Sequence, residues 1–76
     1  MTIEDFIQNF TDQLDEEPVV ALTVETKFRE LDGWSSFVAL SVMAMVDEEY
    51  NVQLTATEMR GAETIGQLFD MVNSHI

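Results

Sequence analysis

Residues 35–50 read SSFVALSVMAMVDEEY, and within them residues 37–46 form the longest uncharged apolar run of the chain. The run contains neither proline nor glycine, and serine is a preferred residue at the start of a helix. Asn51 follows the run, and asparagine tolerates the left-handed conformation that ends many helices. We therefore predict a helix that is capped by Ser35 or Ser36 and extends to about Tyr50.

A helical wheel places apolar residues on both sides of this predicted helix. With Ser36 at the origin, an arc from about 180° to 340° forms a complete core face, made by Val38, Ala39, Val42, Met43, Met45, Val46 and Tyr50. The outer side also carries apolar residues, and there they lie beside polar ones: Ser36, Phe37, Leu40, Ser41, Ala44, Asp47 and Glu48.

Two interpretations of the outer side are open. The helix could be buried all round, but a domain of 76 residues cannot easily surround one of its own helices. We therefore favour a docking surface with an apolar centre and an acidic rim, for a partner with a complementary basic surface. Its residues are Phe37, Leu40, Ser41, Ala44, Asp47 and Glu48, with Ser36 at the edge.

Three further helices are expected around the central one. Apolar residues recur at helical spacing from about Thr2 to Leu14, and Pro18 prevents a continuation. Capping-box patterns then open two helices. The first pattern, Thr55 with Glu58, predicts a short helix ended by Gly61; the second, Thr64 with Gln67, predicts a last helix with the apolar residues Ile65, Leu68, Phe69 and Val72.

The segment from Asp15 to Trp34 is expected to be a long loop. It contains an alternating stretch, residues 20–24, but no second strand is available to pair with it, and a lone strand is not stable. We expect six apolar residues to attach the loop to the core: Val20, Leu22, Val24, Phe28, Leu31 and Trp34. The predicted fold is a single all-α domain over residues 1–76, a four-helix bundle of three long helices and a short third one, with a long loop between helices one and two.

Composition narrows the classes of partner. The formal net charge is −12, from 15 acidic and 3 basic residues. This charge keeps a small protein soluble; it also repels nucleic acid and anionic membranes and attracts basic protein surfaces. The chain has no cysteine, and no segment resembles a signal peptide or a membrane span. We expect a cytoplasmic monomer that binds neither nucleic acid, membrane nor metal.

Ser36 is not accompanied by the groups that would make it a catalytic nucleophile. Such a serine needs a neighbouring base, and the only histidine, His75, is next to the C-terminal residue, where chains commonly fray. The acidic run 47–49 lacks the alternating ligands and the glycine of a calcium loop. A serine at a helix start can still accept a group from another enzyme, or it can simply cap the helix.

These features together resemble the acyl carrier protein family. The family motif Asp-Ser-Leu opens its second helix, and the corresponding residues here are Ser35, Ser36 and Phe37. Apolar residues and the acidic-aromatic end DEEY follow, and the resemblance extends from about Phe28 to Val72. It includes Leu54, the short third helix, and Thr64 with Ile65 before the last helix.

The resemblance implies that the chain is a carrier and not itself an enzyme. Ser36 would receive 4′-phosphopantetheine from coenzyme A through a separate phosphopantetheinyl transferase, and the thiol of that arm would hold an acyl group as a thioester. The outer side of helix two would bind the transferase and the acyl-loading and acyl-processing enzymes. A deformable interior rich in methionine (Met43, Met45, Met59 and Met71) would suit a bundle that shelters an acyl chain.

The chain departs from the family pattern near the attachment serine. Ser35 replaces the usual aspartate, Phe37 replaces leucine, and Val38 and Ser41 stand at positions that are often acidic. The departures favour a specialised acyl or polyketide pathway over general fatty acid synthesis. Aligning the core residues of helix two selects Ser36 over Ser35. Two alternatives stay open: an aminoacyl or peptidyl carrier, and an interaction module that has the fold without the arm.

Overall fold

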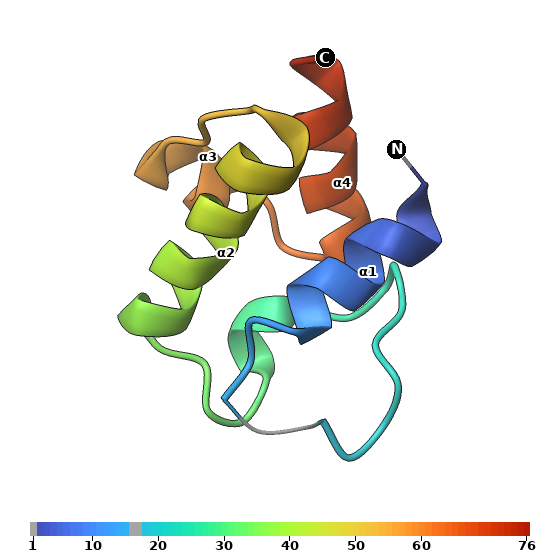
Figure 1. Ribbon diagram of the computed structural model, residues 1–76. Helices are drawn as coiled ribbons and strands as arrows, with labels where there is room; N and C mark the ends of the chain where they lie inside the picture. The colour runs from blue at the N-terminus through green and yellow to red at the C-terminus, as the bar shows by residue number, and fades with distance from the viewer. Residues whose placement is uncertain (1, 16–17) are drawn as a thin grey trace.

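The computed structural model describes residues 2–15 and 18–76 and has an all-α architecture (Figure 1). Met1, and residues 16 and 17 of the predicted loop, lie outside the described part. In chain order the elements are α1 (Ile3–Thr11), the 3₁₀ helix η1 (Phe28–Glu30), α2 (Ser36–Tyr50), α3 (Ala56–Gly61) and α4 (Ile65–Ser74). The described residues form no strand beyond one isolated bridge between Lys27 and Thr64. The predicted four-helix bundle with a short third helix is confirmed.

Helix α2 begins and ends where its local sequence predicts. The Ser35 hydroxyl accepts the Val38 N–H at 3.3 Å and so satisfies one donor of the first turn. At the other end Asn51 has a φ of 57°, in the left-handed region, and its N–H donates to the Asp47 carbonyl at 2.9 Å. Both ends of the helix are therefore capped by the residues that directly flank it, Ser35 and Asn51.

Helix α1 ends at Thr11, three residues before the predicted end at Leu14. After Thr11 the backbone tightens into bonds that span three residues. The Gln13 N–H donates to Phe10 and the Leu14 N–H donates to Thr11, at 3.0 and 3.1 Å. Tight bonds of this kind commonly finish an α-helix. Leu14 packs against the core although it lies outside the helix. Because its position fits the helical spacing of the other buried residues, the sequence pattern predicted a helix that includes it.

Both predicted capping boxes are present. The Thr55 hydroxyl accepts the Glu58 N–H at 3.1 Å, and the Glu58 carboxylate accepts the Thr55 N–H at 3.0 Å. In α4 the Thr64 hydroxyl accepts the Gln67 N–H at 3.2 Å, and the Gln67 side chain accepts the Thr64 N–H at 3.4 Å. Each pair supplies two of the partners that a helix start otherwise lacks.

One apolar core joins all of these elements. Its largest fully buried side chains come from α1, η1, α2 and α4: Phe6, Phe10, Phe28, Ile65, Leu68, Val38, Val42, Val46 and Val72. The four methionines expected at apolar positions are buried (Met45, Met59) or partly buried against this core (Met43, Met71). Among the described residues no helix is both long enough and apolar enough to cross a membrane.

The long loop is attached to the core at fewer places than predicted. Leu22 and Phe28 are buried, and Leu31 and Trp34 are partly buried against the core. Val20 and Val24, by contrast, are 72% and 44% exposed, so their predicted role is wrong. Backbone hydrogen bonds to α4 hold the loop instead: the Ile65 N–H donates to Thr26 at 3.0 Å and the Gly66 N–H donates to Val24 at 2.9 Å. These N–H groups belong to the first turn of α4, where no helical carbonyl can accept them.

Candidate functional site

The two adjacent serines occupy different positions at the start of α2. Ser35 is the cap, and its hydroxyl is bound to the Val38 N–H. Ser36 is the first helical residue; its side chain is exposed, and its hydroxyl takes no part in the cap. The N-terminus of a helix favours a negative group because its backbone N–H groups and its dipole both point there. Ser36 therefore presents an accessible hydroxyl at a position that suits an anionic substituent.

The outer face of α2 is exposed. Phe37 and Leu40 have exposed fractions of 67% and 63%, and Ala44, Asp47 and Glu48 are exposed beside them. Ser41 is partly buried, and its hydroxyl donates to the Phe37 carbonyl at 3.1 Å, so it turns back onto its own helix. The interpretation that α2 is buried all round is wrong. On the opposite side Val38, Val42, Met45 and Val46 are buried, as the helical wheel predicted.

A groove of about 440 Å³ opens beside Ser36 between α2 and α3. Its volume lies within the range of small-molecule sites. One wall comes from α2, the other from α3, and the floor from η1 and Trp34; the lining residues are Phe28, Arg29, Trp34, Ser35, Ser36, Ala39, Leu40, Met43, Ala56, Met59 and Arg60. Of the predicted site residues, Ser36 and Leu40 contribute to this lining.

Aromatic side chains pack against one another at the floor of the groove. Trp34 stacks on Phe10 with ring centroids 6.0 Å apart and planes 5° from parallel, and it also meets Phe28 at 5.2 Å. Phe10 and Phe28 in turn meet edge to face at 5.7 Å. Because Phe10 and Phe28 are buried, the position of Trp34 beside Ser36 is set by the core itself.

Two groove residues, Arg29 and Arg60, were not predicted as site residues. They are two of the three basic residues of the chain, and that scarcity is the signal by which the sequence could have indicated them. Arg29 donates from Nη1 to the carbonyls of Met59 and Ala62, at 3.1 and 2.5 Å. The groove thus combines apolar walls with the few positive charges of an acidic chain.

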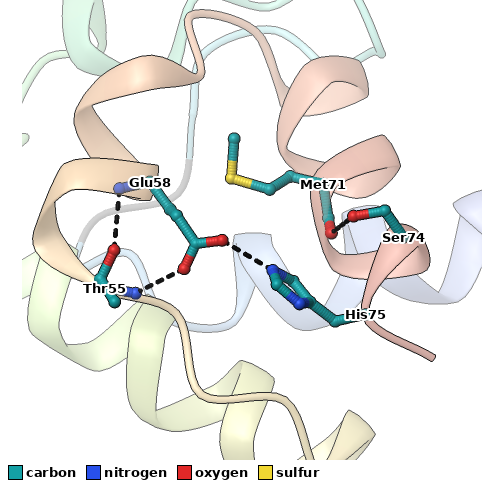
Figure 2. A network of polar contacts seen from close by, with 5 residues as sticks. All are labelled: Thr55, Glu58, Met71, Ser74 and His75. Carbon is teal, nitrogen blue, oxygen red and sulfur yellow. Dashed lines mark hydrogen bonds and ion pairs between the residues drawn. The ribbon is translucent and has the colours of Figure 1, made fainter.

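His75 is held away from Ser36. Figure 1 shows the C-terminus at the opposite end of the molecule from the first turn of α2. Figure 2 shows the His75 ring directed at the Glu58 carboxylate, with Nε2 and Oε2 2.6 Å apart. This contact and the bond from the Ser74 hydroxyl to the Met71 carbonyl, 2.6 Å, connect the end of α4 to α3 and to its own last turn. His75 is not placed to act as a base for Ser36.

The pKa of Glu58 lies below its ordinary value. The largest cause is the hydrogen bond from the Thr55 backbone N–H, and the bond from His75 is the second. Both favour the ionised carboxylate.

The described residues contain no candidate metal site. Within residues 2–15 and 18–76, no group of three or more histidine and carboxylate side chains lies close enough together to hold a metal ion.

Comparisons with known proteins support the fold. No protein-family model matches the sequence, and no curated protein has a significantly similar sequence. Among solved structures, the chain is similar to a holo acyl carrier protein from Geobacter metallireducens, determined in solution by NMR. The TM-score is 0.78 and the sequence identity 22%, and the match covers 96% of this chain and 83% of the other. The chain therefore has the fold of an acyl carrier protein.

Proposed function

We propose that this chain is a carrier protein whose Ser36 hydroxyl receives 4′-phosphopantetheine from coenzyme A. When bound, the arm supplies a thiol that holds an acyl group as a thioester. The observation that carries the proposal is the difference between the two serines at the start of α2. Ser35 satisfies the helix cap, which leaves the exposed Ser36 hydroxyl available for modification at the end of the helix where a phosphodiester is favoured.

The residues around Ser36 fit such an arm and its load. The groove begins at Ser36 and is walled by apolar side chains from Ala39, Leu40, Met43 and Met59. An acyl chain that leaves water for this groove gains the free energy of burying apolar surface, about 25 cal/mol for each Å². The flexible methionines can adjust to chains of different shape. This chain therefore offers both an attachment point and an adjacent shelter.

The exposed face of α2 supports a role in partner binding. Phe37, Leu40 and Ala44 supply an apolar centre beside Ser36, and Asp47 and Glu48 supply acidic charge further along the helix. An apolar centre with a charged rim is the usual anatomy of a protein interface. The enzyme that attaches the arm, and the enzymes that load and process the acyl group, would bind here through basic surfaces.

Intact mass tests the attachment site. Incubation of the purified protein with a phosphopantetheinyl transferase and coenzyme A should raise its mass by one arm. Ser36→Ala should abolish the increase, whereas Ser35→Ala, the matched control one residue away, should still be modified. The site assignment is wrong if Ser36→Ala is modified and Ser35→Ala is not. Wild-type protein that no transferase modifies would refute the carrier function and favour the interaction module without an arm.

Identifying the cargo requires protein that has been isolated from its natural source. We infer a specialised acyl or polyketide pathway because Ser35, Phe37, Val38 and Ser41 differ from the usual neighbours of the attachment serine. The intact mass of the natively produced protein gives the mass of the load. The mass of an unbranched, fully reduced fatty acyl group favours general fatty acid synthesis, another acyl mass supports the specialised pathway, and an aminoacyl or peptidyl mass contradicts both.

A further inference from the structure

Helix α3 forms one wall of the groove, yet it is too short to be stable alone. It spans six residues, and isolated helices shorter than about 12 residues are marginal in water. Contacts with the rest of the chain must therefore hold it. Its start is fastened by the capping box, and Met59, 5% exposed, packs its middle into the core.

Arg29 fastens the other end of α3. Its Nη1 donates to the carbonyls of Met59 and Ala62, at 3.1 and 2.5 Å. The last carbonyls of a helix lack helical partners and carry partial negative charge, so a guanidinium is well suited to them. The Arg29 guanidinium carbon also lies 5.3 Å from the centroid of the Phe28 ring. Because Phe28 is 1% exposed, Arg29 links the end of α3 to the core.

This link joins the α3 wall of the groove to residues on its other side. Arg29 and Phe28 lie on the floor, and Met59, whose carbonyl Arg29 binds, lies on the α3 wall. Because α3 forms one wall of the groove, an acyl chain longer than the groove is fully sheltered only if α3 moves away from α2. Such a movement would stretch or break the two bonds from Arg29.

We propose that Arg29 is a positioning residue that holds α3 against the core and thereby limits the length of the acyl chain that the groove shelters. The limit on chain length rests on the proposed carrier function. The fastening of α3 rests on the contacts of Arg29 alone.

Hydrogen exchange of the unmodified protein tests the fastening. Arg29→Met keeps an apolar stem and removes the donors, and we expect the backbone amides of α3 to exchange about tenfold faster. Arg29→Lys should restore part of the protection. Lys27→Met is the matched control, because it removes the same charge two residues away, outside the groove lining. The fastening is refuted if α3 exchanges at the wild-type rate in Arg29→Met, or equally fast in Lys27→Met.

Thioester hydrolysis tests the limit on chain length. Wild type and variants are loaded with butanoyl and dodecanoyl groups on the arm, and hydrolysis is followed by intact mass. In Arg29→Met the ratio of dodecanoyl to butanoyl hydrolysis rates should fall severalfold, because the longer chain can now enter, and Arg29→Lys should partly restore it. General loosening would accelerate both reactions equally, and an unchanged ratio overturns the proposal.

The Arg60→Met variant tells whether the effect of Arg29 comes from its hydrogen bonds to α3 or from its positive charge. Arg60 also lines the groove, so its replacement removes one positive charge from the same site without removing the bonds to Met59 and Ala62. An equal fall of the ratio in Arg60→Met would assign the effect to charge and overturn the proposal. If no transferase loads Ser36, the carrier function and the chain-length limit both fail. The exchange experiment still decides whether Arg29 fastens α3.

Discussion

The two adjacent serine hydroxyls at the start of α2 have different surroundings. Ser35 lies just outside the helix, where its oxygen reaches the Val38 N–H. Ser36 lies one residue later, inside the first turn, and a shift of one residue rotates a side chain by about 100° around the helix. The two serines therefore cannot exchange roles, although they are chemically identical. The helix geometry makes one structural and leaves the other accessible.

Glu58 also acts through a specific position, and its effect depends on pH. Its pKa is lower in the folded protein than the ordinary value of 4.5, first through Thr55 and then through His75. A carboxylate of this kind stabilises the fold while it is ionised. Its contribution is fully present above about pH 4.5 and is lost as the pH falls through the lower folded value.

We expect Glu58→Gln to lose less stability than wild type as the pH falls below about 4.5. Glutamine can still complete the capping box but does not titrate. Urea unfolding at a series of pH values measures the difference. His75→Gln, which removes one of the two causes, should give an intermediate profile. Coincident acid profiles for wild type and Glu58→Gln would contradict this account.

At the scale of elements, α4 and the long loop are held together by close backbone contact. The Gly66 N–H donates to the Val24 carbonyl, and a Cβ added at Gly66 would lie 3.0 Å from that oxygen and 3.1 Å from the Val24 Cβ. By helix propensity alone, alanine is better than glycine by about 0.5–1 kcal/mol. At this position the added methyl group meets the backbone and the Cβ of Val24, which can retreat only by lengthening the hydrogen bond to the Gly66 N–H.

We therefore expect Gly66→Ala to lower the free energy of unfolding by about 1 kcal/mol or more, as overpacking does. Gly61→Ala is the matched control, because nothing lies within 4 Å of a Cβ added there; it should be neutral or stabilise by up to about 1 kcal/mol. Urea unfolding measures both variants. A Gly66→Ala variant that gains as much stability as Gly61→Ala would show that the loop moves aside freely.

At the scale of the whole molecule, the net charge is −12, and two of the three basic residues line the groove. A field of this strength speeds the approach of basic partners, and salt weakens it. Charge at the rim of an interface mainly changes the rate of association. The acidic residues near the docking face should therefore matter more to partner enzymes than equal charges elsewhere.

We expect Asp47→Asn with Glu48→Gln to lower kcat/KM of the phosphopantetheinyl transferase severalfold at low salt, and the difference should shrink as salt is added. The matched control is Glu4→Gln with Asp5→Asn, the same change in charge in the first turn of α1 and not on the outer face of α2. Initial rates of modification measure the effect. Equal losses in the two double variants would show that total charge matters and the α2 face does not.

Local pattern was sufficient to locate most helix ends and the exposed apolar strip of α2. The caps at Ser35, Thr55 and Thr64 involve residues within a single turn, so their partners are fixed by spacing along the chain. Periodicity also separates the two sides of a helix without reference to any other element. Periodicity failed at Leu14, which packs against the core from a turn, because burial is not restricted to helical residues.

The groove, the fastening of α3 and the attachment of the loop follow from contacts between distant parts of the chain. Arg29 meets the carbonyls of Met59 and Ala62 across 30 and 33 positions, and nothing in either segment indicates the other. Val20 and Val24 alternate as buried residues would, yet they are exposed, and the first turn of α4 holds this loop through the backbone of Val24 and Thr26. The sequence alone is enough to propose Ser36 as the attachment residue; what lies beside it depends on how the folded chain brings η1, α2 and α3 together.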